Sequence, residues 1–225
     1  MTFSVVGRCE KTGQLGVAIS SSSIAVGARC PWVRAGVGVV ATQNVTLPAL
    51  GQQTLDLLEK EALTAAQALE KALLTDQWNA YRQVTVVDGQ GKTAVHSGDK
   101  ALGIYHAVEG DQCVAAGNML ASHAVIEVMV HAFEKSTGLL GDRLLEALQA
   151  GLAAGGEAGP VHSAALKIAG NESWPMVDLR VDWADVQPIE QLAQLWKAYK
   201  PQMQDYLTRA LNPTAAPSYG VPGDE

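Results

Sequence analysis

The chain has 225 residues, a formal net charge of −7 and an apolar content of 48%. This length suits one large domain whose core needs no disulfide or metal to hold it together. The acidic balance argues against nucleic acid or an anionic membrane as a partner, because both attract a concentrated basic face. No segment approaches the roughly 18 consecutive apolar residues of a membrane-spanning helix.

Three cysteines, Cys9, Cys30 and Cys113, are widely spaced and form no CxxC pair. This pattern fits a reducing cytosol better than a disulfide framework or a zinc site. The chain opens without a basic segment followed by an apolar run, so we expect no secretory signal and a cytoplasmic location. The histidines include no i, i+4 pair, and we expect no metal site.

The first 23 residues predict a β-hairpin. Two apolar, β-branched runs, residues 2–8 and 15–19, flank a polar segment that contains a glycine, and the serines Ser20–Ser23 follow. Thr2 comes directly after Met1, so removal of Met1 would leave a threonine with both its hydroxyl and a free α-amine. Such an amine titrates near neutral pH, at about 7.7–8.0, and can act as general base for the hydroxyl.

The rest of the chain alternates groups of strands with pairs of helices. Period-two patterns and short apolar runs predict strands, and apolar residues at a spacing of 3.6 predict helices. The expected strands are residues 37–41, 84–87, 92–96, 113–116, 163–169 and 177–182. The expected helices are residues 48–61, 64–72, 121–133, 140–154 and 188–206, the last being one long helix with Leu195 and Tyr206 among its inward residues.

This order of elements predicts an α+β layered sandwich. Turn chemistry at residues 88–91 indicates a hairpin, which argues against a doubly wound parallel sheet, and no glycine-rich nucleotide loop is present. We expect residues 1–211 to form a single domain and residues 212–225 to form a Pro/Gly-rich tail. That tail is either disordered or docks on a neighbouring molecule through Tyr219.

Polar residues at three strand ends are the first candidates for a functional site, because loops on a rigid scaffold can aim side chains. Ser20–Ser23 close the second strand, either as a solvated turn or as functional hydroxyls. Thr42, Gln43 and Asn44 precede a helix, where they serve as a cap or as donors to an anion or oxyanion. Asn118 precedes another helix, as an ordinary N-cap or as a site residue.

Two kinds of charged or titratable candidate remain. Arg29 and Arg34 flank the Cys30–Trp32 segment, and either can lower the pKa of a neighbouring amine or hydroxyl, although a surface position is the ordinary interpretation. His96 ends its strand and is the most site-like histidine. Neither a Ser-x-x-Lys nor a Gly-x-Ser-x-Gly motif occurs, so a conventional serine hydrolase is not indicated.

A series of short segments also matches a known pattern, in order, over roughly residues 2 to 195. The segments are residues 2–6, 12–18, 25–27, 31–32, 35–38, 41–43, 96–98, 117–120, 163–166 and 178–182. Together they resemble the bacterial domain-of-unknown-function 1028 family, which is placed in the Ntn-hydrolase-like superfamily. The resemblance implies an αββα four-layer sandwich with two mainly antiparallel sheets between helix layers, in agreement with the order of elements.

The resemblance also implies a mechanism, in which an N-terminal Thr, Ser or Cys exposed by processing attacks an amide. By this pattern Thr2 is the expected nucleophile, and a serine among Ser20–Ser23, Ser20 first, is the helper at the end of the second strand. The basic residue expected nearby is Arg34, Arg29 or neither. Thr42 and Gln43 are the expected oxyanion donors. The expected substrate-binding residues are Ser21, Asn44, His96 and Asn118. Proteasome-like members carry an aspartate where this chain has only serines.

The expected function is therefore hydrolysis of a small amide or related C–N bond, with no cofactor, by a homo-oligomer that binds a small-molecule substrate. Two alternatives stay open. A hydroxyl of Ser20–Ser23 or the thiol of Cys9 replaces Thr2 as nucleophile, or the protein binds a metabolite or serves as an assembly subunit without catalysis.

Overall fold

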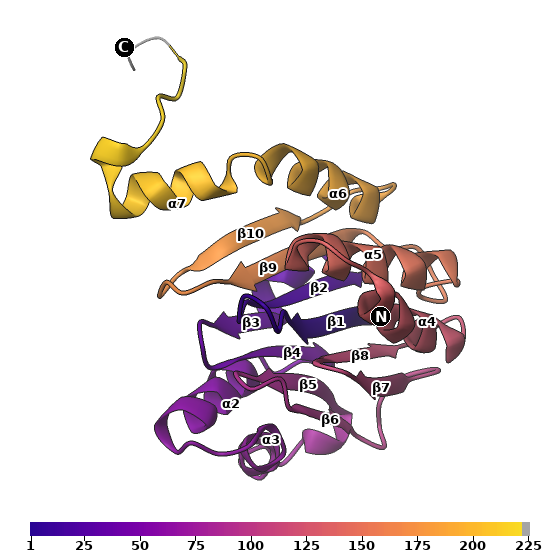
Figure 1. The fold of residues 1–225 in the computed structure, drawn as a ribbon. Coiled ribbons are helices and arrows are strands. Elements are labelled where there is room, and N and C mark those ends of the chain that lie inside the picture. The colour runs from indigo at the N-terminus through magenta and orange to yellow at the C-terminus, as the bar shows by residue number, and fades with distance from the viewer. Residues whose placement is uncertain (222–225) are drawn as a thin grey trace.

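Two antiparallel β-sheets lie face to face in the computed structural model, which describes residues 1–221 (Figure 1). The larger sheet has six strands in the order β10-β9-β2-β1-β8-β7. Its strands are β1 (Thr2–Arg8), β2 (Leu15–Ser21), β7 (His106–Gly110), β8 (Cys113–Asn118), β9 (Ser163–Ala169) and β10 (Pro175–Val181). The smaller sheet has four strands in sequential order, β3 (Pro31–Arg34), β4 (Gly38–Asn44), β5 (Arg82–Asp88) and β6 (Thr93–Ser97).

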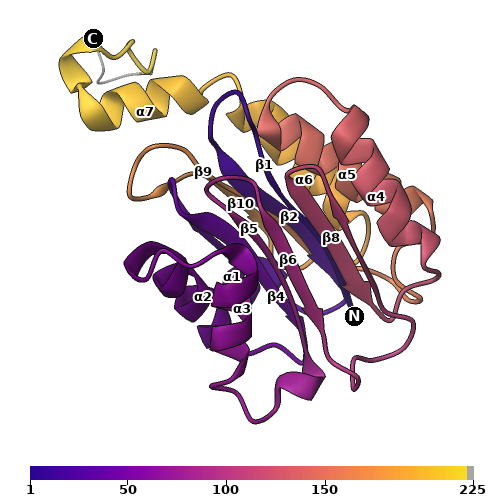
Figure 2. The ribbon, with the colours of Figure 1, turned by 60° about the horizontal axis from the view of Figure 1, so that its bottom comes forward.

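Helices cover the outer face of each sheet. The helices are α1 (Val26–Arg29), α2 (Ala49–Lys60), α3 (Ala65–Leu73), α4 (Ala124–Lys135), α5 (Leu140–Ala153), α6 (Pro188–Tyr199) and α7 (Met203–Leu211). Helices α4, α5 and α6 pack on the six-stranded sheet, and α2 and α3 pack on the four-stranded sheet (Figures 1 and 2). The expected αββα four-layer sandwich is thereby confirmed.

Strand β1 lies in the middle of the larger sheet, between β2 and β8. Because side chains alternate along a strand, β1 contributes side chains to two hydrophobic cores, one on each face of its sheet. Phe3 and Val5 join the core beneath α4 and α5, whereas Val6 joins the core between the two sheets. The hairpin that connects β1 to β2 turns at Gly13, whose φ of 72° is in the left-handed region.

The predicted starts of two helices, α3 and α6, agree with the structure. Thr64 is the N-cap of α3, where its hydroxyl accepts from the Gln67 N–H and the Gln67 side chain accepts from the Thr64 N–H. Pro188 opens α6, as expected of a residue that has no N–H to leave unpaired.

The end of the chain differs from the expectation of one long helix. The helix breaks between Tyr199 and Met203, where Pro201 removes a backbone donor, and α7 follows as a separate element. Helix α7 has no buried residue, and Leu195 and Tyr206 are 42% and 41% exposed, so the prediction that they point inward is wrong. Both views show α7 projecting beyond the sandwich (Figures 1 and 2).

The predicted tail begins with a short 3₁₀ helix, Pro213–Ala215, and the Arg209 guanidinium lies 3.8 Å from the centre of the Tyr219 ring. Its last four residues, 222–225, lie outside the described part of the chain. Over residues 1–221, no helix is both long and apolar enough to cross a membrane.

Candidate active site

The space between the two sheets is apolar at one end and polar at the other. At the apolar end, the facing positions are valines of five strands, Val6, Val17, Val39, Val87 and Val114. Further along these strands and on the neighbouring β6, in the direction of the start of β1, the positions with the same alternation carry polar side chains. We call these residues the inter-sheet polar layer: Thr2, Ser4, Ser21, Gln43, Gln83, Ser97 and Asn118.

Gln83 is the centre of this layer. Its Oε1 accepts from Gln43 Nε2 at 2.8 Å and from Asn118 Nδ2 at 3.1 Å. Its Nε2 donates to Ser97 Oγ at 3.0 Å, and Ser4 Oγ of β1 donates to Gln43 Oε1 at 2.8 Å. The network joins β1 and β8 of one sheet to β4, β5 and β6 of the other. Its three amide side chains are buried, and Ser97 is half-buried. A buried hydrogen-bond network of this kind fixes the relative position of the strands.

Thr2 lies at the edge of this layer, opposite Ser21 of β2 on one side and Asn118 of β8 on the other. Thr2 is 6% exposed, and its Oγ1 lies 3.1 Å from Ser21 Oγ. The carbonyl oxygen of Met1 accepts from Thr2 Oγ1 at 2.5 Å and also from Ser21 Oγ. Two hydroxyls therefore converge on one carbonyl oxygen at the start of β1.

A second acceptor beside Thr2 is unused. Asn118 Oδ1 is buried and has no hydrogen-bond partner among residues 1–221. Because Asn118 is the neighbour of Thr2 across the β1–β8 pairing, this oxygen belongs to the same polar end of the sandwich. A buried acceptor without a donor is costly, so it favours any donor group that reaches this point.

Glu157 supplies a carboxylate close to the N-terminus, and no sequence pattern points to it. The Ser22 N–H donates to both of its oxygens, at 3.2 and 3.3 Å. Burial raises the pKa of the Glu157 carboxyl to about 7, against the opposing effects of the N-terminal ammonium and of hydrogen bonds from Ser22. A carboxyl with this pKa exchanges its proton near neutral pH.

Glu157 also lines an open cavity of about 390 Å³ next to the N-terminus. Other lining residues include Gly159, Val161 and Val186. A Cβ at Gly159 would lie 3.1 Å from Cε of Met1, so the Met1 side chain reaches the wall of this cavity. The volume falls in the range of pockets that hold small molecules, roughly 300–1,000 Å³.

Two other predicted residues lie close in sequence to this site but on the opposite faces of their strands. Ser20 alternates with Ser21, and its Oγ donates to the Ser163 carbonyl at 3.0 Å. Thr42 alternates with Gln43, and its Oγ1 accepts from Thr46 Oγ1 at 2.9 Å. The structure therefore brings Thr2, Ser21, Gln43 and Asn118 together, and leaves Ser20 and Thr42 facing the helix layers.

Arg34 and His96 lie away from Thr2. Arg34 pairs with Gly38 at the far end of β4, about 17 Å along the strand from Gln43 at roughly 3.3 Å per residue. Its guanidinium binds Asp56 and Glu59 of α2, at 2.7 and 2.6 Å. His96 alternates with Ser97, which faces the other sheet, and His96 Nε2 lies 2.9 Å from the Asn79 carbonyl.

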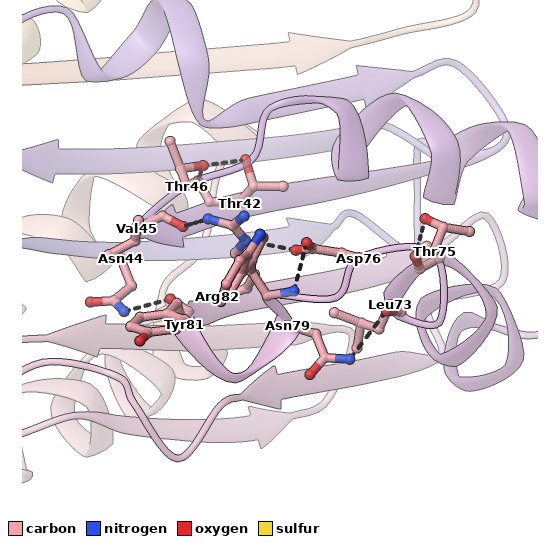
Figure 3. Close-up of polar contacts among 12 residues, drawn as sticks. Thr42, Asn44, Val45, Thr46, Leu73, Thr75, Asp76, Asn79, Tyr81 and Arg82 are labelled. Carbon is pink, nitrogen blue, oxygen red and sulfur yellow. Dashed lines mark hydrogen bonds and ion pairs between the residues drawn. The ribbon is translucent and has the colours of Figure 1, made fainter.

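Asn44 holds loops rather than lining the polar layer. Its φ is 69°, its Nδ2 donates to the Tyr81 carbonyl at 2.6 Å and its Oδ1 accepts from the Leu102 N–H at 3.3 Å. Beside it, Arg82 donates to the Val45 carbonyl at 2.6 Å and to Asp76 at 2.7 Å (Figure 3). These contacts fix the loops that surround the polar end of β4 and β5.

Cys9 lies at the opposite end of β1 from Thr2, about 23 Å away at roughly 3.3 Å per residue. Cys9, Cys30 and Cys113 are all free and buried. Residues 1–221 contain no group of three or more His, Cys, Asp or Glu side chains that could hold a metal ion.

Comparison with known proteins identifies relatives by sequence and by structure. A family model described as a family of unknown function, DUF1028, matches residues 2–192. The crystal structure of protein SPO2555 from Silicibacter pomeroyi, assigned to the same family, is 30% identical with a TM-score of 0.81, and the match covers 88% of this chain and 89% of that one. No curated protein matches the chain.

More distant structural similarity extends to Anbu, the ancestral beta-subunit. Anbu from Yersinia bercovieri is 12% identical with a TM-score of 0.42, and the match covers 90% of this chain and 96% of that one. The Gly-1 mutant of Anbu from Hyphomicrobium sp. strain MC1 is 15% identical with a TM-score of 0.45 and the same coverage. Identities and TM-scores this low indicate nothing about the activity of this chain. The family match, by contrast, spans most of the sequence, and the chain belongs to the DUF1028 family.

Proposed function

We propose that the protein hydrolyses a small amide or related C–N bond, with Thr2 as the N-terminal nucleophile after removal of Met1. The observation that carries this proposal is the convergence of the Thr2 and Ser21 hydroxyls on the Met1 carbonyl oxygen. When Met1 is absent, a substrate carbonyl can take the place of that oxygen, next to a hydroxyl that can attack and a second one that can donate. The adjacent cavity of about 390 Å³ offers room for a small substrate.

In the proposed reaction, the Thr2 α-amine accepts the proton of Thr2 Oγ1 as this oxygen attacks the amide carbon. Ser21 Oγ donates to the oxyanion that forms. The C–N bond then breaks, the leaving amine takes the proton from the α-ammonium, and an ester of Thr2 remains. Water, deprotonated by the α-amine, hydrolyses the ester and restores the free threonine.

Two neighbouring groups support this chemistry through their effect on the α-amine. The buried, unpartnered Asn118 Oδ1 is an acceptor for the amine that removal of Met1 would create. The Glu157 carboxylate, which accepts from the Ser22 N–H and lies close to the N-terminus, can balance the protonated form of the α-amine that Thr2 acquires when Met1 is removed.

The first experiment is the intact mass of the natively expressed protein, followed by an amide screen. A mass that lacks one methionine, and release of p-nitroaniline from a panel of acyl p-nitroanilides, would support the proposal. Thr2→Ala should abolish release, whereas Thr208→Ala, an equivalent change on the exposed helix α7, should leave it unchanged. Retention of Met1 by the active protein would overturn the terminal-nucleophile mechanism.

We further propose that the protein works in the cytoplasm as a homo-oligomer. The three free cysteines suit a reducing compartment. Tyr206 and Leu211, at 41% and 55% exposure, give α7 an apolar surface that a second copy can cover. A monomeric mass in light scattering at micromolar concentration would reject the oligomer.

A further inference from the structure

A second cavity lies at the opposite end of β1 from Thr2. Its volume is about 220 Å³, and three connections of the larger sheet and its helices form it: the β1–β2 loop, the β7–β8 turn and the α4–α5 loop. Three cationic side chains line it, Arg8 from the end of β1, Lys11 from the β1–β2 loop and Arg143 from α5. Such a group of cations is unusual for a chain whose net charge is −7.

These cations form no ion pair in the part of the chain that the structure describes. Arg34 and Arg82 each form an ion pair with a carboxylate, but Arg8, Lys11 and Arg143 form none. Glu10 and Asp111 line the same cavity without pairing to a guanidinium. Arginines that share a cavity repel one another, so an anion between them would relieve an unfavourable interaction.

Both guanidinium groups are held in place and still have donors to spare. Arg8 Nη1 donates to Gln112 Oε1 at 2.7 Å. Arg143 Nη2 donates to the Phe133 carbonyl at 3.1 Å, and its guanidinium lies 4.1 Å from the centre of the Phe133 ring. Arg8 Nη2 and Arg143 Nη1 make no hydrogen bond within residues 1–221, and the two Nε atoms are buried and also lack a partner. Planar, pre-positioned guanidinium groups with free donors match the geometry of phosphate and carboxylate oxygens.

We propose that this cavity binds a small oxyanion, a phosphate or carboxylate group, between Arg8 and Arg143. The site is separate from the proposed active site, because the whole length of β1 lies between them, and it does not depend on whether Thr2 is catalytic. Lys11, on the exposed part of the loop, adds long-range attraction for the anion.

Cys9 provides a reporter inside the same cavity. Burial raises its pKa, but hydrogen bonds from Thr12 and Lys11 and the charge of Arg143 outweigh that effect, so the pKa of Cys9 is lowered overall. Burial raises the pKa of Cys30 to about 11 and that of Cys113 to about 12. Cys9 is 8% exposed and lines the cavity, so we expect it to be the cysteine that reacts with a small thiol reagent near neutral pH, and an anion bound next to it should slow the reaction.

The test measures alkylation of Cys9 by iodoacetamide, a neutral reagent, using mass spectrometry of the peptide that contains it. The intact protein is compared in inorganic phosphate, acetate and chloride at equal ionic strength, which separates phosphate from carboxylate recognition and both from screening. If phosphate binds with a dissociation constant of about 1 mM, about 10 mM phosphate should slow alkylation about tenfold relative to chloride. Protection by acetate alone would assign the site to a carboxylate and would also support the proposal.

Variants then locate the effect, each being compared with itself in chloride because Arg143 also influences the thiol. Arg8→Gln and Arg143→Gln should lose the protection, whereas Arg180→Gln, on β10, should retain it. If either cavity variant fails to fold, Lys11→Gln, at an exposed loop position, should still weaken the protection. Equal alkylation rates in all three salts, or protection that survives in both arginine variants, would overturn the proposal.

Discussion

Thr2 Oγ1 and Ser21 Oγ lie 3.1 Å apart across the pairing of β1 with β2. The register of that pairing decides which serine faces Thr2, because side chains alternate along β2 and a shift by one residue would present Ser20 instead. The contact therefore depends on the whole hairpin rather than on the serine run itself.

We predict that Ser21→Ala lowers kcat for amide hydrolysis by about 10²–10³-fold, the usual effect of removing one oxyanion donor, with a smaller change in KM. Ser20→Ala removes the hydroxyl of the adjacent residue, which faces the helix layer and donates to Ser163. It should have much less effect on kcat. Steady-state kinetics on a substrate from the amide screen would check both, and an equal loss in the two variants would assign the effect to the strand end as a whole.

Replacement of Glu157 by glutamine should change how stability depends on pH in the protein that carries Met1. The folded pKa of about 7 is above the ordinary value of 4.5, so the protonated carboxyl is favoured by folding. This contribution is complete below pH 4.5 and is lost as the pH rises to 7. Above pH 7, Glu157→Gln should therefore be more stable than the unmodified protein, by on the order of 2–3 kcal/mol.

Urea denaturation at several pH values measures this difference directly. Glu146→Gln on α5 is a matched control, because Glu146 is exposed. Its stability should differ from that of the parent by no more than about 0.5 kcal/mol at any of these pH values. A difference for Glu157→Gln that stays constant between pH 4.5 and 7 would contradict the prediction.

Gln83→Ala should be among the most destabilising polar substitutions in the chain. It leaves Gln43 Nε2 and Asn118 Nδ2 without their acceptor and opens a cavity between the sheets. We expect a loss of about 2–4 kcal/mol in the free energy of unfolding. The matched change Gln194→Ala on the exposed face of α6 should cost less than about 0.5 kcal/mol. Guanidinium denaturation compares the two, and similar midpoints would show that the network contributes little.

Local pattern was sufficient for much of the fold. The hairpin at the N-terminus, the capping box at Thr64 and the alternation in β9 and β10 are signals carried by neighbouring residues. Two strands escaped detection, β3 and β7, because each is short and only partly buried, so neither has a clear period of two. The break before α7 was missed because the apolar spacing continues past Pro201 even though the backbone hydrogen bonds do not.

The site was harder to predict than the fold, because it is formed by strands that are distant in sequence. Thr2, Ser21, Gln43 and Asn118 were visible as strand-end residues, but only the packing of one sheet on the other shows which face of each strand they occupy. Gln83 and Glu157 gave no local signal. A glutamine near the start of a strand and an acid in a glycine-rich segment are ordinary surface patterns, and tertiary structure buries them.

The ion pair between Asp76 and Arg82 holds the loop that precedes β5 against the start of that strand (Figure 3). The Asp76 and Arg82 side chains are 5% and 11% exposed, and their atoms Oδ2 and Nε lie 2.7 Å apart. Asp76→Asn leaves the Arg82 charge largely buried without a partner, so we expect a loss of about 3–5 kcal/mol at pH 7. Asp178→Asn, which breaks a more exposed pair with Lys167, should cost less than about 1 kcal/mol.

The pH dependence supplies an independent check on the same ion pair. The hydrogen bond from Arg82 lowers the pKa of Asp76 below its ordinary value of 3.8, against a smaller opposing effect of burial. A lowered folded pKa means that the stabilisation is present above pH 3.8 and is lost as the pH falls through the folded pKa. The difference between the parent and Asp76→Asn should therefore shrink in acid and remain constant between pH 5 and 7, because the carboxylate stays ionised throughout that range. Asparagine keeps an oxygen that can accept from the Trp78 N–H, so this hydrogen bond does not distinguish the two proteins. A difference that persists undiminished below the folded pKa would therefore contradict a role of the Asp76 charge.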